Sequence, residues 1–229
     1  MKKHGFSLVE LVLSIVVIGI SLMTIPLMLG QSSKSNQYAL MQESILAART
    51  KMGNILSFKW DDNAKDINKS IIRVLDVRLG NVDLNRSSLG NIRRKGHIKE
   101  SGRRRMSNFE RNASLGQEVA DEFNDIDDFD GESVLVAPAN FGEEGKFDYV
   151  DADLNLTTIV RFISDDTNYS KQTINFDFNV SSATNDVNKS TNIKMIELNA
   201  TSKNRDFPFV FRTFSSNIGQ SLLYERLKK

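Results

Sequence analysis

Cysteine is absent from the 229-residue sequence, which excludes disulfide bonds, thiolate metal sites and cysteine nucleophiles. Only two histidines occur, so zinc coordination and serine–histidine catalysis have few residues to draw on. The net charge is also small, because 30 Lys and Arg nearly balance 29 Asp and Glu, and the total charge therefore gives no information about an acidic or nucleic-acid partner. With 40% hydrophobic residues, the chain can still bury one sizeable core.

Motifs of enzymes are also missing from the sequence. It contains no phosphate-binding glycine loop, no nucleophile elbow and no pair of acids in a context of strand and helix that would support catalysis. The sequence therefore predicts a protein that is not an enzyme and has no cofactor, apart from the calcium considered below.

The apolar run at 6–30 is 25 residues long, and Glu10 is its only ionisable side chain. Seventeen of its positions are Phe, Leu, Val, Ile or Met, and a helix of this length spans a bilayer. A secretory signal would have a shorter apolar region followed by a small-x-small cleavage site, which is missing here. The basic residues at 2–4 predict a cytoplasmic N-terminus, with the chain beyond Gly30 outside.

Residues 2–11 read Lys-Lys-His-Gly-Phe-Ser-Leu-Val-Glu-Leu. This segment resembles the type IV prepilin motif, in which a short basic leader ends in Gly and is followed by Phe and, at the fifth mature position, Glu. The resemblance implies cleavage after Gly5 by a prepilin peptidase and N-methylation of Phe6. It also implies that Glu10 is an assembly residue, which neutralises the Phe6 amine of a neighbouring subunit. The alternative is an acid that is merely tolerated near the membrane surface.

What the resemblance implies is a minor pilin or pseudopilin, a structural subunit of a type IV pilus or a type II secretion pseudopilus. Its partners would be other pilin or pseudopilin subunits, the prepilin peptidase, an inner-membrane assembly platform and membrane lipid. The chain would first lie in the bacterial inner membrane as a single-pass protein with a periplasmic C-terminal domain, and then enter the fibre. Two alternatives stay open: a tip binding module (an adhesin or DNA-uptake pilin) using loops of 61–131, and a membrane-anchored β-domain without a fibre.

An amphipathic helix should continue the apolar run to about Phe58. Its apolar stripe has helical spacing and consists of Tyr38, Met41, Ile45, Ala48, Met52 and Ile55. The following segment, Ile55–Asn63, looks like the helix end of minor pilins from mannose-sensitive haemagglutinin pili, and we interpret its Trp60 as a packing anchor. A short helix is expected around Asp66–Leu79.

Beyond residue 132 the apolar residues recur with a period of two, which predicts strands. The expected strands are 133–136, 154–162, 174–180, 193–200 and 209–214. The predicted fold class is α+β, the pilin fold, with a long N-terminal helix packed on one antiparallel sheet. Its segments would be a leader (1–5), a transmembrane helix half (6–30), an amphipathic half (31–60), a polar connection (61–131), the sheet (132–214) and a tail (215–229).

Two charged stretches lie in the polar connection. Clustered carboxylates suit a hard cation, so calcium is a candidate ligand of Asp125, Asp127, Asp128 and Asp130, although an EF-hand alignment fails and a solvated turn is the alternative. The basic stretch at 93–111 could bind DNA, but acids adjoin it and aromatic side chains are not interleaved before Phe109. We therefore do not expect a nucleic-acid partner. The two stretches could equally form complementary surfaces.

Overall fold

The computed structural model describes residues 7–64, 71–86, 106, 111–117, 122–136, 153–165, 167–169, 171–173, 175, 178–202 and 205–221. The chain forms two compact units, Met1–Ile45 and Leu46–Lys229. The long helix α1 (Leu8–Leu56) contributes to both of them, and it makes up nearly all of the described part of the first unit.

Helix α1 is continuous through Pro26, although proline removes one backbone donor from a helix. Hydroxyl groups in its apolar part bond to the helix itself, as where Ser21 Oγ donates to the Val17 carbonyl at 2.8 Å. The last turn tightens, because the Phe58 amide donates to the Ile55 carbonyl at 3.1 Å, three residues back. The helix therefore ends at Leu56, slightly before the predicted end at Phe58.

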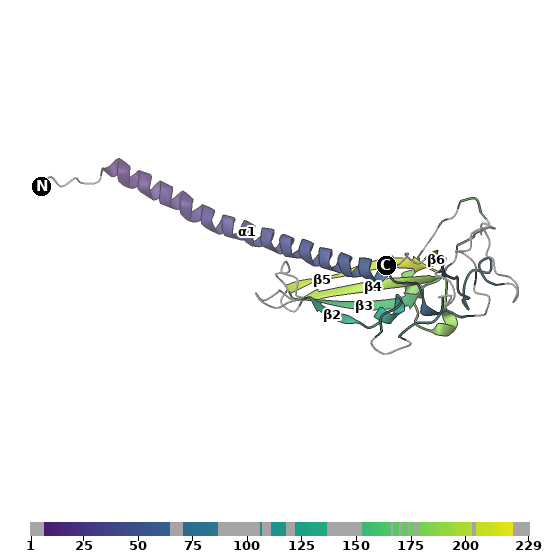
Figure 1. Ribbon diagram of the computed structural model, residues 1–229. Coiled ribbons are helices and arrows are strands. Elements are labelled where there is room, and N and C mark those ends of the chain that lie inside the picture. The colour runs from purple at the N-terminus through teal and green to yellow at the C-terminus, as the bar shows by residue number, and fades with distance from the viewer. Residues whose placement is uncertain are drawn as a thin grey trace, which may run out of the picture. The chain divides into compact units, whose positions relative to one another are not determined.

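Four antiparallel strands form the main sheet of the second unit (Figure 1). They are β2 (Ser133–Val136), β3 (Leu154–Phe162), β4 (Ile193–Ser202) and β5 (Arg205–Ser216), in the order β2-β3-β4-β5. Burial alternates strictly along β3, as its period of two predicts. The expected strands at 133–136, 154–162, 193–200 and 209–214 are thereby confirmed, and β4 and β5 extend past them.

The principal core joins the end of α1 to one face of this sheet. From the helix it takes Ala48, Met52 and Ile55, the C-terminal part of the predicted apolar stripe. From the remainder of the unit it takes Ile126, Phe129, Leu154, Leu156, Val160, Ile196, Leu198 and Ala200. Helix-on-sheet packing of this kind confirms the predicted α+β class.

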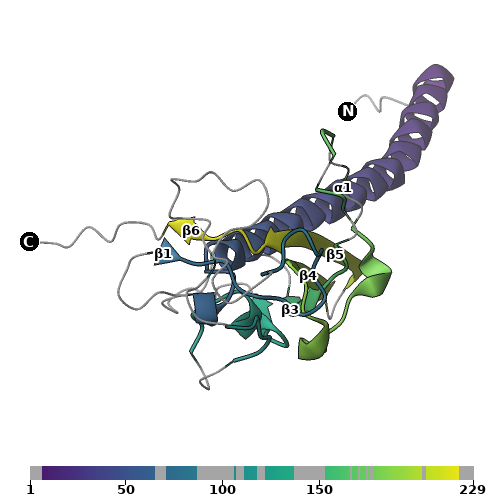
Figure 2. The same ribbon diagram turned by 90° about the vertical axis from the view of Figure 1, so that its right-hand side faces the viewer.

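A second, two-stranded sheet pairs β1 (Ile71–Ile72) with β6 (Gln220–Ser221), which lie side by side in Figure 2. The predicted helix at 66–79 is wrong for the described residues 71–79, which are extended or irregular. The physical reason is their β-branched content, which favours pleated structure. The Asn217 side chain fixes this extended course, accepting from the Leu75 amide at 3.0 Å and donating to the Leu75 carbonyl at 2.9 Å.

The strand predicted at 174–180 is also wrong in its described part. Residues 174, 176 and 177 lie outside the described residues, and Val180–Ser182 forms a 3-10 turn, η4. The Asn179 side chain accepts a hydrogen bond from the Ser181 amide at 3.0 Å and so caps this turn. A local side-chain bond has replaced the pairing that the alternating apolar residues suggested.

Candidate functional site

Glu10 lies in the first turn of α1, with its side chain exposed. Its Oε2 accepts a hydrogen bond from the Ser7 amide at 3.4 Å, as an acid near a helix N-terminus is placed to do. Gly5 and Phe6, the predicted cleavage and methylation site, lie outside the described residues. The assembly role of Glu10 and the processing at Gly5 and Phe6 remain predictions.

The part of α1 that follows Glu10 exposes apolar side chains on every face. Within the described residues, α1 is the one helix long and apolar enough to cross a membrane. Helices with apolar residues all around are found in large cores or in membranes. Because this window of α1 is not buried within the molecule, a lipid bilayer or other apolar helices must cover it.

In the predicted acidic loop, aspartate carboxylates accept hydrogen bonds from backbone amides of the same loop. Asp128 Oδ2 accepts from the Asn124 amide at 2.6 Å and from the Asp125 amide at 2.9 Å. Asp125 Oδ1 accepts from the Asp127 amide at 3.0 Å, and these bonds shape the turn η3 (Asp127–Phe129). Carboxylates that accept backbone N–H groups in this way stabilise turns. The loop is therefore a structural element, in which most of the predicted aspartates are buried.

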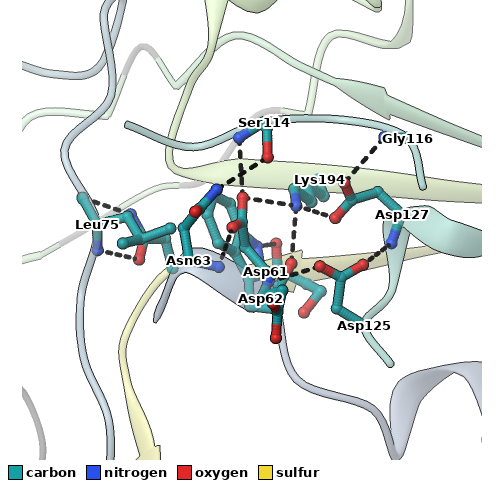
Figure 3. A network of polar contacts seen from close by, with 12 residues as sticks. Asp61, Asp62, Asn63, Leu75, Ser114, Gly116, Asp125, Asp127 and Lys194 are labelled. Carbon is teal, nitrogen blue, oxygen red and sulfur yellow. Dashed lines mark hydrogen bonds and ion pairs between the residues drawn. The ribbon is translucent and has the colours of Figure 1, made fainter. Parts of the chain in front are cut away.

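Lys194 lies at the centre of the buried polar cluster, by which we mean Asp61, Asp125, Asp127 and Lys194 (Figure 3). Its Nζ donates to the Trp60 carbonyl at 2.7 Å, to Asp61 Oδ2 at 3.3 Å and to Asp127 Oδ1. These three bonds account for all three protons of the ammonium group. Lys194 is 0% exposed, and its Nζ lies 4.3 Å from the centre of the Trp60 ring.

Each carboxylate of the cluster is also held by the backbone. Asp61 Oδ2 accepts from the Ser114 amide at 2.9 Å, and Asp127 Oδ2 accepts from the Gly116 amide at 3.0 Å. Asp125 Oδ2 accepts from the Asp62 amide at 2.6 Å. The cluster thus ties the segment after α1, the turn η3 and strand β4 together.

Burial changes the proton affinities inside the cluster. It raises the pKa of Asp125 to about 6, against the opposing attraction of Lys194. Burial also raises the pKa of Asp127, and the neighbouring charge of Asp125 acts in the same direction. For Lys194, burial alone would lower the pKa, but Asp61, Asp127 and Asp125 outweigh it and raise the pKa.

Sequence reasoning missed Asp61 and Lys194. A signal was present for the lysine: in an alternating strand, residue 194 shares its face with Ile196 and Leu198, which are core residues. A charged residue on an inward face requires a buried partner of opposite charge. Asp61 carries no comparable pattern, since it follows Trp60 in an irregular segment.

The calcium prediction is not settled by this geometry. Within the described part of the chain, no three His, Asp or Glu residues are arranged to hold a metal ion. Asp130, the fourth predicted ligand, accepts from Arg161 Nη1 at 2.7 Å and from the Val160 amide at 2.9 Å. Calcium would have to compete with Arg161 and Lys194, and its binding remains a prediction. Most of the basic stretch, 93–105 and 107–110, lies outside the described residues.

Comparison with known proteins identifies the N-terminal segment. The family model described as "Prokaryotic N-terminal methylation motif" matches residues 1–25. The chain has the N-terminus of a type IV pilin-like protein. No curated protein and no solved structure matches this pilin-like chain. The motif implies processing by a prepilin peptidase and assembly with other pilin subunits.

The pilin-like assignment agrees with the fold of the chain. A long apolar N-terminal helix, whose C-terminal turns pack on a four-stranded antiparallel sheet, is a pilin-like layout. Proteins with this motif are structural. The motif and the apolar helix together indicate anchoring in a membrane.

Proposed function

We propose that this pilin-like chain is a minor pilin or pseudopilin, a structural subunit of a type IV pilus or type II secretion pseudopilus. The observation that carries the proposal is the methylation motif at 1–25, which overlaps the first turns of the continuous helix α1. In this function the apolar part of α1 lies in the inner membrane and then packs against the same segment of other subunits in the fibre. The inner-membrane assembly platform would move the subunit from one environment to the other.

Glu10 supports this proposal through the cost of burying charge. An ionised side chain within a membrane segment is expensive and tends to mark function. In a fibre, the methylated amine of Phe6 would be buried among apolar helices, and a neighbour's Glu10 would neutralise it. Each side chain then offsets the cost of burying the other.

Processing is the first test. We expect cleavage after Gly5 to leave an N-methylated Phe6, because Gly5 and Phe6 resemble the junction between leader and mature chain in type IV prepilins; the match of the methylation motif to residues 1–25 supports this expectation. Intact-mass and N-terminal peptide spectrometry of the membrane-extracted protein measures this. An intact Met1, or a cut near Gly30, would contradict the assignment to a pilus or pseudopilus.

Replacement of Glu10 by Leu tests the assembly role. Membrane insertion should stay normal or improve, because an intramembrane charge is removed. Assembly should fail, because the Phe6 amine of a neighbour would be buried without a counter-charge, typically at a cost of about 3–5 kcal/mol. Cell fractionation and immunoblotting of sheared fibres measure both effects.

The isosteric Glu10→Gln variant is the matched control for side-chain size, and it should also be missing from fibres. The Glu10→Asp variant keeps the charge and should retain more incorporation than either. Normal incorporation of Glu10→Leu would refute the pairing role in this subunit. It would favour a position at the fibre tip, where no further subunit needs the pairing.

A further inference from the structure

The contact between Lys194 and Asp127 brings an amine and a carboxyl group together in the interior. Lys194 Nζ touches Asp127 Oδ1, and both side chains are 0% exposed. The two residues are 67 positions apart, one on strand β4 and the other in the turn η3. Amine and carboxylic acid are the two groups from which an amide forms.

The surroundings of this pair exclude water. The Trp60 ring centre lies 4.3 Å from Lys194 Nζ, and the Phe162 ring centre lies 5.7 Å from it. Both rings belong to buried side chains. Burial away from water destabilises an ion pair relative to the neutral amine and acid, which arise from it by transfer of one proton.

Two further groups occupy positions that amide formation requires. Asp61 Oδ2 lies 3.3 Å from Lys194 Nζ, close enough to accept a proton from the nitrogen. The Gly116 amide donates to Asp127 Oδ2 at 3.0 Å, where negative charge develops when a nucleophile adds to the carboxyl carbon. A nucleophile, an electrophile, a proton carrier and an oxyanion donor are therefore in one site.

We propose that Lys194 and Asp127 join in an intramolecular amide bond, formed by the chain itself with the loss of one water molecule. Proton transfer within the pair first gives a neutral amine and a carboxylic acid. The amine nitrogen then adds to the Asp127 carboxyl carbon, and Asp61 takes a proton from the nitrogen. Asp61 returns this proton to the hydroxyl group, the C–O bond breaks and water leaves. Nothing is oxidised or reduced, and no external reactant is needed.

The bond would connect the central strand β4 covalently to the turn η3, closing the chain between residues 127 and 194. It does not depend on fibre assembly, since all participants lie in the unit Leu46–Lys229 of one chain. Absence of the amide bond would therefore leave the proposed function as a fibre subunit unaffected. Likewise, a chain that does not assemble into fibres could still form the amide bond.

Mass spectrometry of the full chain, extracted in detergent and unfolded before measurement, tests the proposal. We expect a mass lower by one water than that of the processed sequence. Protease digestion should then yield a branched peptide linking Lys194 to Asp127. The branched peptide is decisive, because the Asp130–Gly131 sequence can also lose water by cyclising on its own backbone. A full mass with only linear peptides over Lys194 and Asp127 would overturn the proposal.

Three variants separate the roles of the residues. Lys194→Met should lack the branched peptide. Asp61→Asn keeps the side chains of Lys194 and Asp127 but should remain largely unlinked, because the proton carrier is lost. Asp127→Asn should release ammonia in place of water and give a linked product of the same mass as the linked parent. Linking in Asp61→Asn as complete as in the parent would refute the role of Asp61.

Discussion

Before the proposed amide forms, Lys194 is a buried charge that its surroundings must accommodate. Transfer of an ammonium group into the interior costs several kcal/mol, which is offset only by close opposite charges and complete hydrogen bonding. Asp61 and Asp127 supply the charges, and the Trp60 carbonyl completes the bonding. Removal of Lys194 would leave the carboxylates of Asp61 and Asp127 buried without a counter-charge.

Asp125 predicts a pH dependence of stability. Its pKa is 3.8 in the unfolded reference and about 6 in the folded protein, mainly because of burial. The folded state therefore binds more protons between these values, and its stability falls as pH rises from about 4 to about 6. A shift of this size corresponds to about 3 kcal/mol at most. The direction is the same with or without an amide at Lys194, since burial is the largest cause.

The Asp125→Asn variant should lack the part of this pH dependence that comes from Asp125. Urea unfolding of residues 31–229 between pH 4 and 7, followed by the fluorescence of the single Trp60, measures it. The stability of the parent relative to this variant should fall as pH rises. Asp186→Asn, at a partly exposed turn, is the control and should run parallel to the parent. Parallel curves for Asp125→Asn would contradict the raised pKa.

At the scale of elements, two adjacent residues at the end of α1 differ in burial. Ile55 is 0% exposed in the principal core, whereas Leu56 is 41% exposed. Ile55→Ala should lower the free energy of unfolding by about 2–5 kcal/mol, because it leaves a cavity against the sheet. Leu56→Ala should cost less than about 1 kcal/mol. Urea unfolding of both variants measures the difference, and equal losses would show that Ile55 does not anchor the helix.

Elements with long, regular patterns could be predicted from the sequence. The stripe through Ala48, Met52 and Ile55 and the alternation through β3 each repeat several times, so one irregular residue does not obscure them. The β-branched residues at 71–79 favoured extended structure, but the side chain that fixes the course of this segment comes from a distant residue. The turn at 178–182 is fixed by a single local side-chain bond. Asn217, which holds Leu75, is 142 positions away in the sequence.

The candidate sites also differ in how far they could be predicted from the sequence. Glu10 could be proposed as an assembly residue because its spacing from the leader is local and fixed, and that role remains a prediction. The buried polar cluster could be found only in part, because it is assembled from three separate segments. The aspartates at 125–128 stood out as a group, and the alternation in β4 indicated a buried partner for Lys194, but nothing in the sequence connected the two segments.

For the whole molecule, the basic residues at 2–4 predict that the second unit lies outside the cytoplasmic membrane. The absence of cysteine permits a clean test with Ser181→Cys, which places a single thiol at an exposed turn. A membrane-impermeant maleimide should label this variant in intact cells or spheroplasts. Labelling only after the membrane is opened would reverse the predicted orientation.

The contacts of Lys194 that connect the end of α1 to β4 affect how the folded unit would bear tension. If the chain is a fibre subunit, as proposed, load on a stretched fibre would enter the folded unit through α1 and reach Asp61 shortly after the helix ends. Asp61 and Asp127 both contact Lys194 on β4, which is hydrogen-bonded to a strand on each side. Tension would therefore reach a strand that is hydrogen-bonded on both sides, so bonds to two neighbouring strands would have to break before β4 could leave the sheet.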